Sequence, residues 1–204
     1  MKNNKNISRK DRLKSKKLAP ANYLIVCEGE QTEPNYFKGL KKKINEKYGS
    51  KVDVLIPNIE IKGTGENTTA LVKYTDKFVN YSNKRYGQVW VVFDKAIKNC
   101  DYNVAWSNPN FELWLLSHFK KVNRYISKDN VLQELSKEFQ KKGLGEYTKN
   151  DTNIFEKVTS EERLHTAIKN CEYMEELNKD GQESRRNPMT KVYKIIDGLK
   201  EYLE

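Results

Sequence analysis

The stretch Tyr23–Phe37 reads YLIVCEGEQTEPNYF, and its pattern decides the fold that we expect for this chain. Its first five residues, 23–27, form a continuous apolar run of the kind that makes a buried strand. The run breaks at Gly29. A helix is predicted to follow, with Glu33 and Pro34 in its first turn, where an acid and a proline are both favoured. The stretch therefore predicts a strand, a turn and a helix in direct succession.

Three carboxylates, Glu28, Glu30 and Glu33, follow this strand. Open α/β sheets bind ligands beyond the carboxyl ends of their strands, so these acids either hold a metal ion or merely belong to a turn. Glu28 is the acid that we expect at the strand tip itself. Glu33 is a second candidate from the start of the helix, and Glu30 is expected to be a turn residue.

A second strand signal, Gln88–Asp94, reads QVWVVFD and also ends in one acid. A continuous apolar run of this kind predicts a fully buried strand with Asp94 at its tip. The tips of neighbouring parallel strands point to the same edge, so Glu28 and Asp94 are expected to lie together. Converging carboxylates without neutralising lysines repel one another, and Mg²⁺, which prefers oxygen ligands, would relieve that repulsion.

The remaining segments complete an alternating pattern. Strands are also predicted at 52–56, 58–61 and 104–108, with Pro57 marking an edge strand or a bulge. Helices are predicted at 33–47, 68–85, 111–119, 128–142, 151–157, 160–178 and 188–203. The alternation predicts an α/β protein whose mostly parallel sheet has helices on both faces. We expect three parts: a flexible basic arm at 1–18, an α/β core at 19–120 and a helical extension, packed on the core, at 121–204.

The formal net charge of +10 is unevenly distributed. Residues 2–17 hold eight Lys and Arg residues against one acid, Asp11, whereas the rest of the chain is close to neutral. A basic arm on a balanced body favours binding to a polyanion, most simply nucleic acid. A solvated tail without a partner explains the same pattern equally well.

The three cysteines are far apart and form no C-x-x-C pair, so a structural zinc site is not expected. A reduced, cytoplasmic setting is the simplest interpretation. No apolar run approaches the roughly 20 residues of a membrane span, so no membrane partner is expected.

Several blocks along the chain occur together in one known family. They are 27–37 (CEGEQTEPNYF), 91–94 (VVFD), 107–114 (SNPNFELW), 147–150 (YTKN) and 187–192 (NPMTKV). In this order they resemble the RloB-like family, over nearly the whole chain after the arm. The resemblance implies a bacterial defence protein, associated with restriction loci and abortive infection. It also implies a core similar to the Toprim fold of topoisomerases, primases and OLD-type nucleases.

The Toprim resemblance implies a Glu after the first strand and an Asp-x-Asp after a later one. Glu28 and Asp94 match, but the second Asp would fall on Ala96. The connection after Asp94 is also short, because a parallel crossover usually needs ten or more residues. Either the chain has lost a loop, and catalysis with it, or the sequence omits a segment between Lys95 and Ala96, which we favour. Asp101 is a weaker substitute.

The resemblance implies a Mg²⁺-dependent nuclease, with Mn²⁺ as an alternative ion, that cleaves DNA or RNA in antiphage defence. Its catalytic residues would be Glu28, Asp94 and Glu112, and its metal ligands Glu28, Glu33 and Asp94. The alternative is a non-catalytic subunit that binds nucleic acid or docks on a partner protein encoded in a defence locus. A primase- or ligase-like nucleotidyl transferase fits the same metal chemistry but lacks a nucleotide-binding signature.

Other polar residues have simpler explanations. Glu112 lies among core residues and is either paired structurally or reaches the site. Asn108 and Ser107 are expected to cap the next helix rather than contact a phosphate. His118 is interpreted as a helix-end histidine, and no Ser/His/Asp or Cys/His set indicates a side-chain nucleophile. The loop 63–67 (GTGEN) is interpreted as a plain turn.

Overall fold

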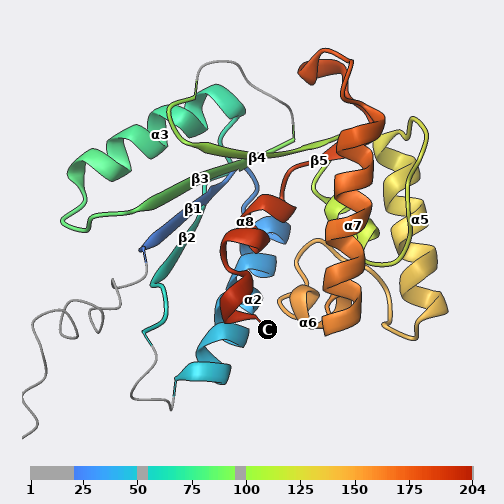
Figure 1. Ribbon diagram of the computed structural model, residues 1–204, viewed down its shortest axis with the longest axis horizontal. Coiled ribbons are helices and arrows are strands. Elements are labelled where there is room, and N and C mark those ends of the chain that lie inside the picture. The colour runs from blue at the N-terminus through green and yellow to red at the C-terminus, as the bar shows by residue number, and fades with distance from the viewer. Residues whose placement is uncertain (1–20, 50–54, 95–99, 204) are drawn as a thin grey trace, which may run out of the picture.

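The fold is built around a five-stranded sheet (Figure 1). A computed structural model describes residues 21–49, 55–94 and 100–203 of the chain. The strands are β1 (Tyr23–Cys27), β2 (Ile59–Gly63), β3 (Gln88–Phe93), β4 (Asn103–Asn108) and β5 (Met189–Thr190). The helices are α2 (Thr32–Tyr48), α3 (Thr68–Tyr81), α4 (Glu112–Ser117), α5 (Lys128–Lys141), α6 (Ile154–Val158), α7 (Glu161–Leu177) and α8 (Tyr193–Gly198). Single 3-10 turns lie at Glu183–Arg185 and Lys200–Tyr202.

The strand order is β2-β1-β3-β4-β5, and the first four strands are parallel. β1 lies between β2 and β3, and each of its five residues is buried. This position explains why its sequence is apolar without alternation. β2 lies at the edge of the sheet, which confirms the prediction drawn from Pro57.

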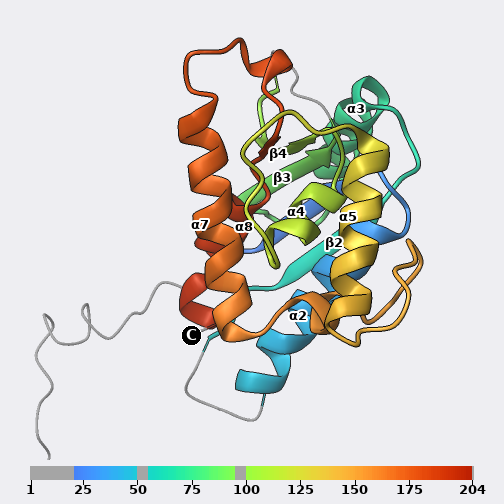
Figure 2. The same cartoon turned by 90° about the vertical axis from the view of Figure 1, so that its right-hand side faces the viewer.

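Helices cover both faces of the sheet, as the alternation predicted. The chain moves one way across the sheet from β1 to β2 and the other way from β2 to β3. Because such crossovers are right-handed, α2 and α3 are placed on opposite faces, as Figure 1 shows. Helices α4, α5 and α7 stand beside the β4–β5 end, where α4 lies between α5 and α7 (Figure 2), and α6 packs against α2.

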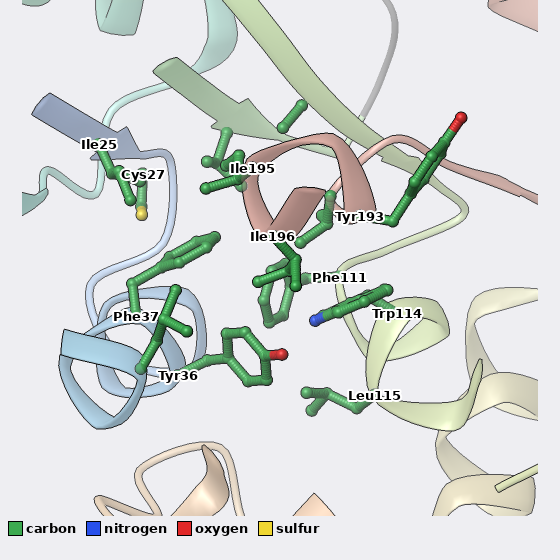
Figure 3. Packing of buried hydrophobic residues seen from close by; sticks show 14 of the residues in the cluster. Ile25, Cys27, Tyr36, Phe37, Phe111, Trp114, Leu115, Tyr193, Ile195 and Ile196 are labelled. Carbon is green, nitrogen blue, oxygen red and sulfur yellow. The ribbon is translucent and has the colours of Figure 1, made fainter. Parts of the chain in front are cut away.

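An aromatic cluster joins the sheet layer to the second half of the chain. Tyr36 and Phe37 on α2 meet Phe111 and Trp114 at the start of α4, and all four side chains are buried (Figure 3). The ring centroids of Tyr36 and Trp114 are 6.0 Å apart and nearly perpendicular, the edge-to-face arrangement that aromatic pairs favour. The cluster fixes α4, and hence the residues at its start, against α2.

The predicted helix at 188–203 is wrong. Residues Met189–Thr190 form β5, which pairs antiparallel with β4, and only the short helix α8 and a 3-10 turn follow. The Thr190 hydroxyl lies 2.8 Å from that of Ser107 in the interior. This tertiary pairing outweighs local helix preference, and it places Ser107 in the sheet rather than at a helix cap.

Two strand predictions also need correction. In the segment predicted as a strand at 52–56, residues 52–54 lie outside the described residues, and Leu55 and Ile56 are not in a strand. β3 is buried only over its last three residues, whereas Gln88, Val89 and Trp90 are half-buried, so the strand is not fully enclosed. The predicted arm at 1–18 and the junction of Lys95 and Ala96 lie outside the described residues.

None of the helices in the described ranges is long and apolar enough to cross a membrane. All three cysteines are free, with Cys27 and Cys171 buried.

His118, at the carboxyl end of α4, is enclosed in the core with 1% of its surface exposed. Its Nδ1 lies 3.0 Å from the backbone oxygen of Trp114, and its ring packs against the indole at 4.7 Å. Burial lowers the pKa of His118 to about 4, because the charged form loses its hydration. This residue is a helix-end histidine, as the sequence indicated.

We expect His118 to contribute a loss of stability as the pH falls from about 6.5 to 4, opposite in sign to the contributions of the buried carboxylates Glu33 and Asp94. In this window the unfolded chain binds a proton at His118 and the folded chain does not, which lowers the free energy of unfolding by about 3 kcal/mol. Denaturant unfolding of wild type and His118→Phe at pH 7 and pH 4.5 measures the effect. The variant should lose less stability on acidification, while His165→Phe, at an exposed position, should behave like wild type. Equal acid sensitivity of all three proteins would contradict this explanation.

Candidate functional site

Glu28 and Asp94 lie at the tips of the adjacent strands β1 and β3, and the structure brings them together. The Glu28 N–H still pairs with the backbone oxygen of Val92 at 2.9 Å, so the residue continues the strand. Its carboxylate accepts the Asp94 N–H at 3.1 Å and the Thr68 hydroxyl at 3.3 Å. The Glu28 side chain is thereby held across the end of the sheet.

Asp94 is held by the segment that starts α4 and by the first turn of α5. Its Oδ1 accepts the Phe111 N–H at 3.1 Å, and its Oδ2 lies 3.6 Å from the Lys128 ammonium nitrogen. Burial raises the pKa of Asp94 to about 6, and the charges of Glu112 and Glu28 add to this effect, whereas Lys128 opposes it. The carboxylate is therefore strained electrostatically, in spite of its lysine partner.

Glu33, in the first turn of α2, folds back over Gly29. A Cβ at Gly29 would lie 2.2 Å from Glu33 Oε2, so any other residue at this position would force the carboxylate to move. Burial raises the pKa of Glu33 to about 7. The nearby negative charges that reinforce the shift belong to Asp94, Glu112 and Glu28.

Glu112, the first residue of α4, is buried with 4% of its surface exposed. Its Oε1 accepts the Tyr147 hydroxyl at 2.9 Å and lies 4.0 Å from the Lys149 ammonium nitrogen. Burial and the charge of Glu112 raise the pKa of Tyr147, which keeps this hydroxyl protonated as a donor. Glu112 is thus both paired structurally and turned toward the site.

These residues line one pocket of about 490 Å³ at the carboxyl edge of the sheet. Its charged lining consists of six carboxylates and two lysines: Glu28, Glu30, Glu33, Glu66, Asp94, Glu112, Lys128 and Lys149. The loop 63–67, interpreted as a plain turn, forms part of the wall. Its Gly65 has a φ of +66° and lies against Glu30, where a Cβ would meet Oε1 at 2.9 Å. Asn67 ends the loop by capping α3 through the Ala70 N–H at 3.2 Å.

Sequence reasoning missed the donors that hold the acids in place, namely Thr68, Lys128 and Tyr147. Lys128 follows the Ser127 cap of α5, a helix-start signal that says nothing about Asp94. Tyr147 belongs to the YTKN block, whose only signal was the family resemblance. These contacts are tertiary, and no spacing along the chain encodes them.

Other candidates lie elsewhere. Asn108 donates to the backbone oxygen of Arg186 at 2.8 Å and caps no helix. Asp101 precedes β4, so it lies at the amino-terminal edge of the parallel strands, away from Asp94. Among the described residues, no three His, Cys, Asp or Glu side chains are grouped so that they could hold a metal ion as they stand.

The fold and the pocket define an open α/β protein with a carboxylate-rich site at the carboxyl ends of its central strands. The family model described as "RloB-like protein" matches residues 23–199, and the chain belongs to this family. Searches of curated proteins and of solved structures each found no match.

Removing the buried charge of Glu33 should stabilise the protein above neutral pH. Its folded-state pKa of about 7 exceeds the ordinary value of 4.5, so the contribution of Glu33 to stability falls as the pH rises from 4.5 through 7. Glu33→Gln carries no such charge and should exceed wild type by on the order of 2 kcal/mol at pH 8, with little difference at pH 4.5. Thermal unfolding in EDTA measures the difference.

Glu66→Gln is the matched control, because Glu66 lines the same pocket but is exposed. It should leave the unfolding temperature unchanged at both pH values. A destabilised Glu33→Gln at pH 8, or an equal gain in the control, would refute the electrostatic strain.

Proposed function

We propose that this protein is a Mg²⁺-dependent nuclease with a Toprim-like core, acting in bacterial antiphage defence. The observation that carries the proposal is the pairing of Glu28 and Asp94 at adjacent strand tips, joined by the 3.1 Å bond from the Asp94 N–H. The family membership supports the defence role, since the RloB-like resemblance implies it.

The chemistry of the lining suits a hard divalent cation. Glu28, Asp94 and Glu33 offer only oxygen ligands, which Mg²⁺ and Mn²⁺ prefer. Bound there, the ion would activate water and stabilise charge on the leaving oxygen of a phosphodiester. Lys128 now neutralises Asp94 at 3.6 Å, so binding of the ion requires this lysine to move away.

The side chains of the pocket have separate roles in this proposal. Glu28 holds the metal ion or accepts a proton, and Asp94 is a metal ligand. Glu112, fixed by Tyr147, supports the site from the start of α4. Lys128 and Lys149 carry the positive charge that binds the phosphate oxygens of the substrate, DNA or RNA.

A second candidate function is a non-catalytic subunit that binds nucleic acid or docks on a partner protein of a defence system. It is favoured by the positions of the acids, which are not grouped for a metal ion in the described residues. Ala96 in place of a second Asp favours it as well. Cleavage assays separate the two functions.

The first test is cleavage of single-stranded and double-stranded DNA and RNA with Mg²⁺ or Mn²⁺. Wild type should cleave at least one of these substrates. Glu28→Gln and Asp94→Asn should each lower the rate by roughly 100-fold or more, because loss of a direct ligand exceeds the 10- to 100-fold cost of a supporting residue. Glu66→Gln, on the rim of the same pocket, should retain activity. Full activity in Glu28→Gln and Asp94→Asn would refute the assignment, and inactivity of wild type on every substrate would favour the second candidate.

The second test is metal binding without substrate. Mg²⁺ or Mn²⁺ at about ten times its Kd should stabilise wild type by about 1.4 kcal/mol, because the ion binds only the folded state. Asp94→Asn should abolish this gain, whereas Glu66→Gln should keep it. Calorimetric titration and thermal unfolding report the effect independently of cleavage. Equal metal response in wild type and Asp94→Asn would remove Asp94 from the ligand set.

A further inference from the structure

A second cavity lies on the other side of the first turn of α5. It measures about 410 Å³, within the range of ligand sites. Its lining includes Lys120, Lys121, Arg124, Tyr125 and Asn130. We call the segment 120–127 the α4–α5 loop, and Figure 2 shows it running from α4 to the start of α5. Lys128 lines the carboxylate pocket and Asn130 the second cavity, so the two cavities are neighbours.

The α4–α5 loop is held firmly although it carries no regular structure. Val122 is buried, and the Asn187 side chain binds both backbone groups of Ile126, accepting its N–H at 3.0 Å and donating to its oxygen at 3.0 Å. Asn187 also donates to Asn108 at the end of β4, at 3.5 Å. These bonds tie the loop to the β4 end of the sheet. The loop therefore presents its outward side chains from a fixed platform.

Those outward side chains are one aromatic ring and three cations. Tyr125 is 75% exposed, which is high for so large an apolar ring. Lys120 is paired with Glu134 at 2.7 Å, and the Lys121 ammonium lies 3.1 Å from the centre of the Tyr173 ring. In the described part of the chain, no hydrogen bond or ion pair engages the Arg124 side chain.

We propose that the α4–α5 loop and its cavity bind an unpaired stretch of nucleic acid, with a base stacked on Tyr125 and its phosphate on Arg124 and Lys121. An exposed aromatic ring beside cations is the combination that binds single strands without sequence preference. The neighbouring carboxylate pocket receives the next part of the strand. The inference rests on the proposed function, because it takes the strand to continue toward the carboxylate pocket. It deepens that function by naming single-stranded nucleic acid as the substrate class.

An unpaired strand fits better than a duplex because a base must leave its stack to reach Tyr125. In a duplex the base faces are already covered by their neighbours, so the ring would remain exposed to water. The stacked base removes this exposed apolar surface and leaves the phosphate beside Arg124. A plain polyanion would use the cations but not the ring, and the test separates these cases.

The test is fluorescence anisotropy of labelled 12-nucleotide single strands, of DNA and of RNA, with the full chain in EDTA. Tyr125→Ala should weaken binding by roughly 5- to 100-fold, and Tyr125→Trp should restore it, because stacking needs only an aromatic face. Arg124→Gln should weaken binding and reduce the slope of log Kobs against log salt by about 0.7, the value for one phosphate of a single strand. Duplexes of the same length should bind more weakly and respond little to Tyr125→Ala.

The matched control is Tyr81→Ala with Arg85→Gln. Tyr81 is also an exposed tyrosine (87%), and both residues precede β3, at the opposite edge of the sheet. This pair should leave the affinity for single strands unchanged. The proposal is overturned if Tyr125→Ala and Arg124→Gln bind like wild type, or if the control pair loses as much affinity. It is also overturned if Tyr125→Ala weakens the binding of a poly-glutamate peptide as much as that of single strands, since the site would then bind any polyanion.

The binding assay contains no divalent metal, so its result is separate from that of the nuclease. If wild type cleaves no substrate but binds single strands in a way that depends on Tyr125, the proposed nuclease activity is refuted and the proposed binding site stands. If cleavage depends on Glu28 but Tyr125→Ala leaves binding unchanged, the proposed binding site is refuted and the proposed nuclease activity stands.

Discussion

The hydrogen bond from the Asp94 N–H to Glu28 joins the two strand ends on which the whole carboxyl edge of the sheet depends. A carboxylate at the tip of a buried strand needs donors, because water reaches it only from one side. β3 supplies one donor to Glu28 through its backbone, and α3 supplies another through Thr68. Asp94 in turn takes the Phe111 N–H, which positions the start of α4. Through these hydrogen bonds, Glu28 and Asp94 hold the end of β3, the start of α3 and the start of α4 together at the pocket.

The second half of the chain completes that arrangement with side chains from distant positions. Lys128, at the start of α5, approaches Asp94, and Tyr147 and Lys149 approach Glu112. The positive charges of the two lysines lower the repulsion among acids that burial has made costly. The aromatic cluster of Tyr36, Phe111 and Trp114 keeps this half against α2, so the lysines stay within reach. Pocket and core are in this sense one structure, since the residues that pack the second half also close the site.

Continuous apolar runs and helix-start signals made the central architecture predictable. β1 and α2 lie within one or two residues of the positions that the stretch Tyr23–Phe37 predicted, and the meeting of Glu28 with Asp94 followed from parallel strands alone. β5 could not be predicted, because two residues have no period and their pairing depends on β4. The partial exposure of Trp90 was also missed, because the burial of a strand residue depends on which helix covers the strand and not on the sequence of the strand itself. The donors around the acids stayed hidden because they lie far away along the chain, as Thr68 does from Glu28, at a separation of 40 residues.

The late position of β5 in the chain has a consequence for biosynthesis. β4 is made by residue 108, but its antiparallel neighbour is made only at residues 189–190. During translation the edge of β4 is therefore open while some 80 further residues are added. Open strand edges template association with other chains, and long-range pairing slows folding. Until Met189 and Thr190 are made, the end of β4 at Ser107 and Asn108 lacks its partner strand, which leaves the nascent chain open to pairing with a second copy.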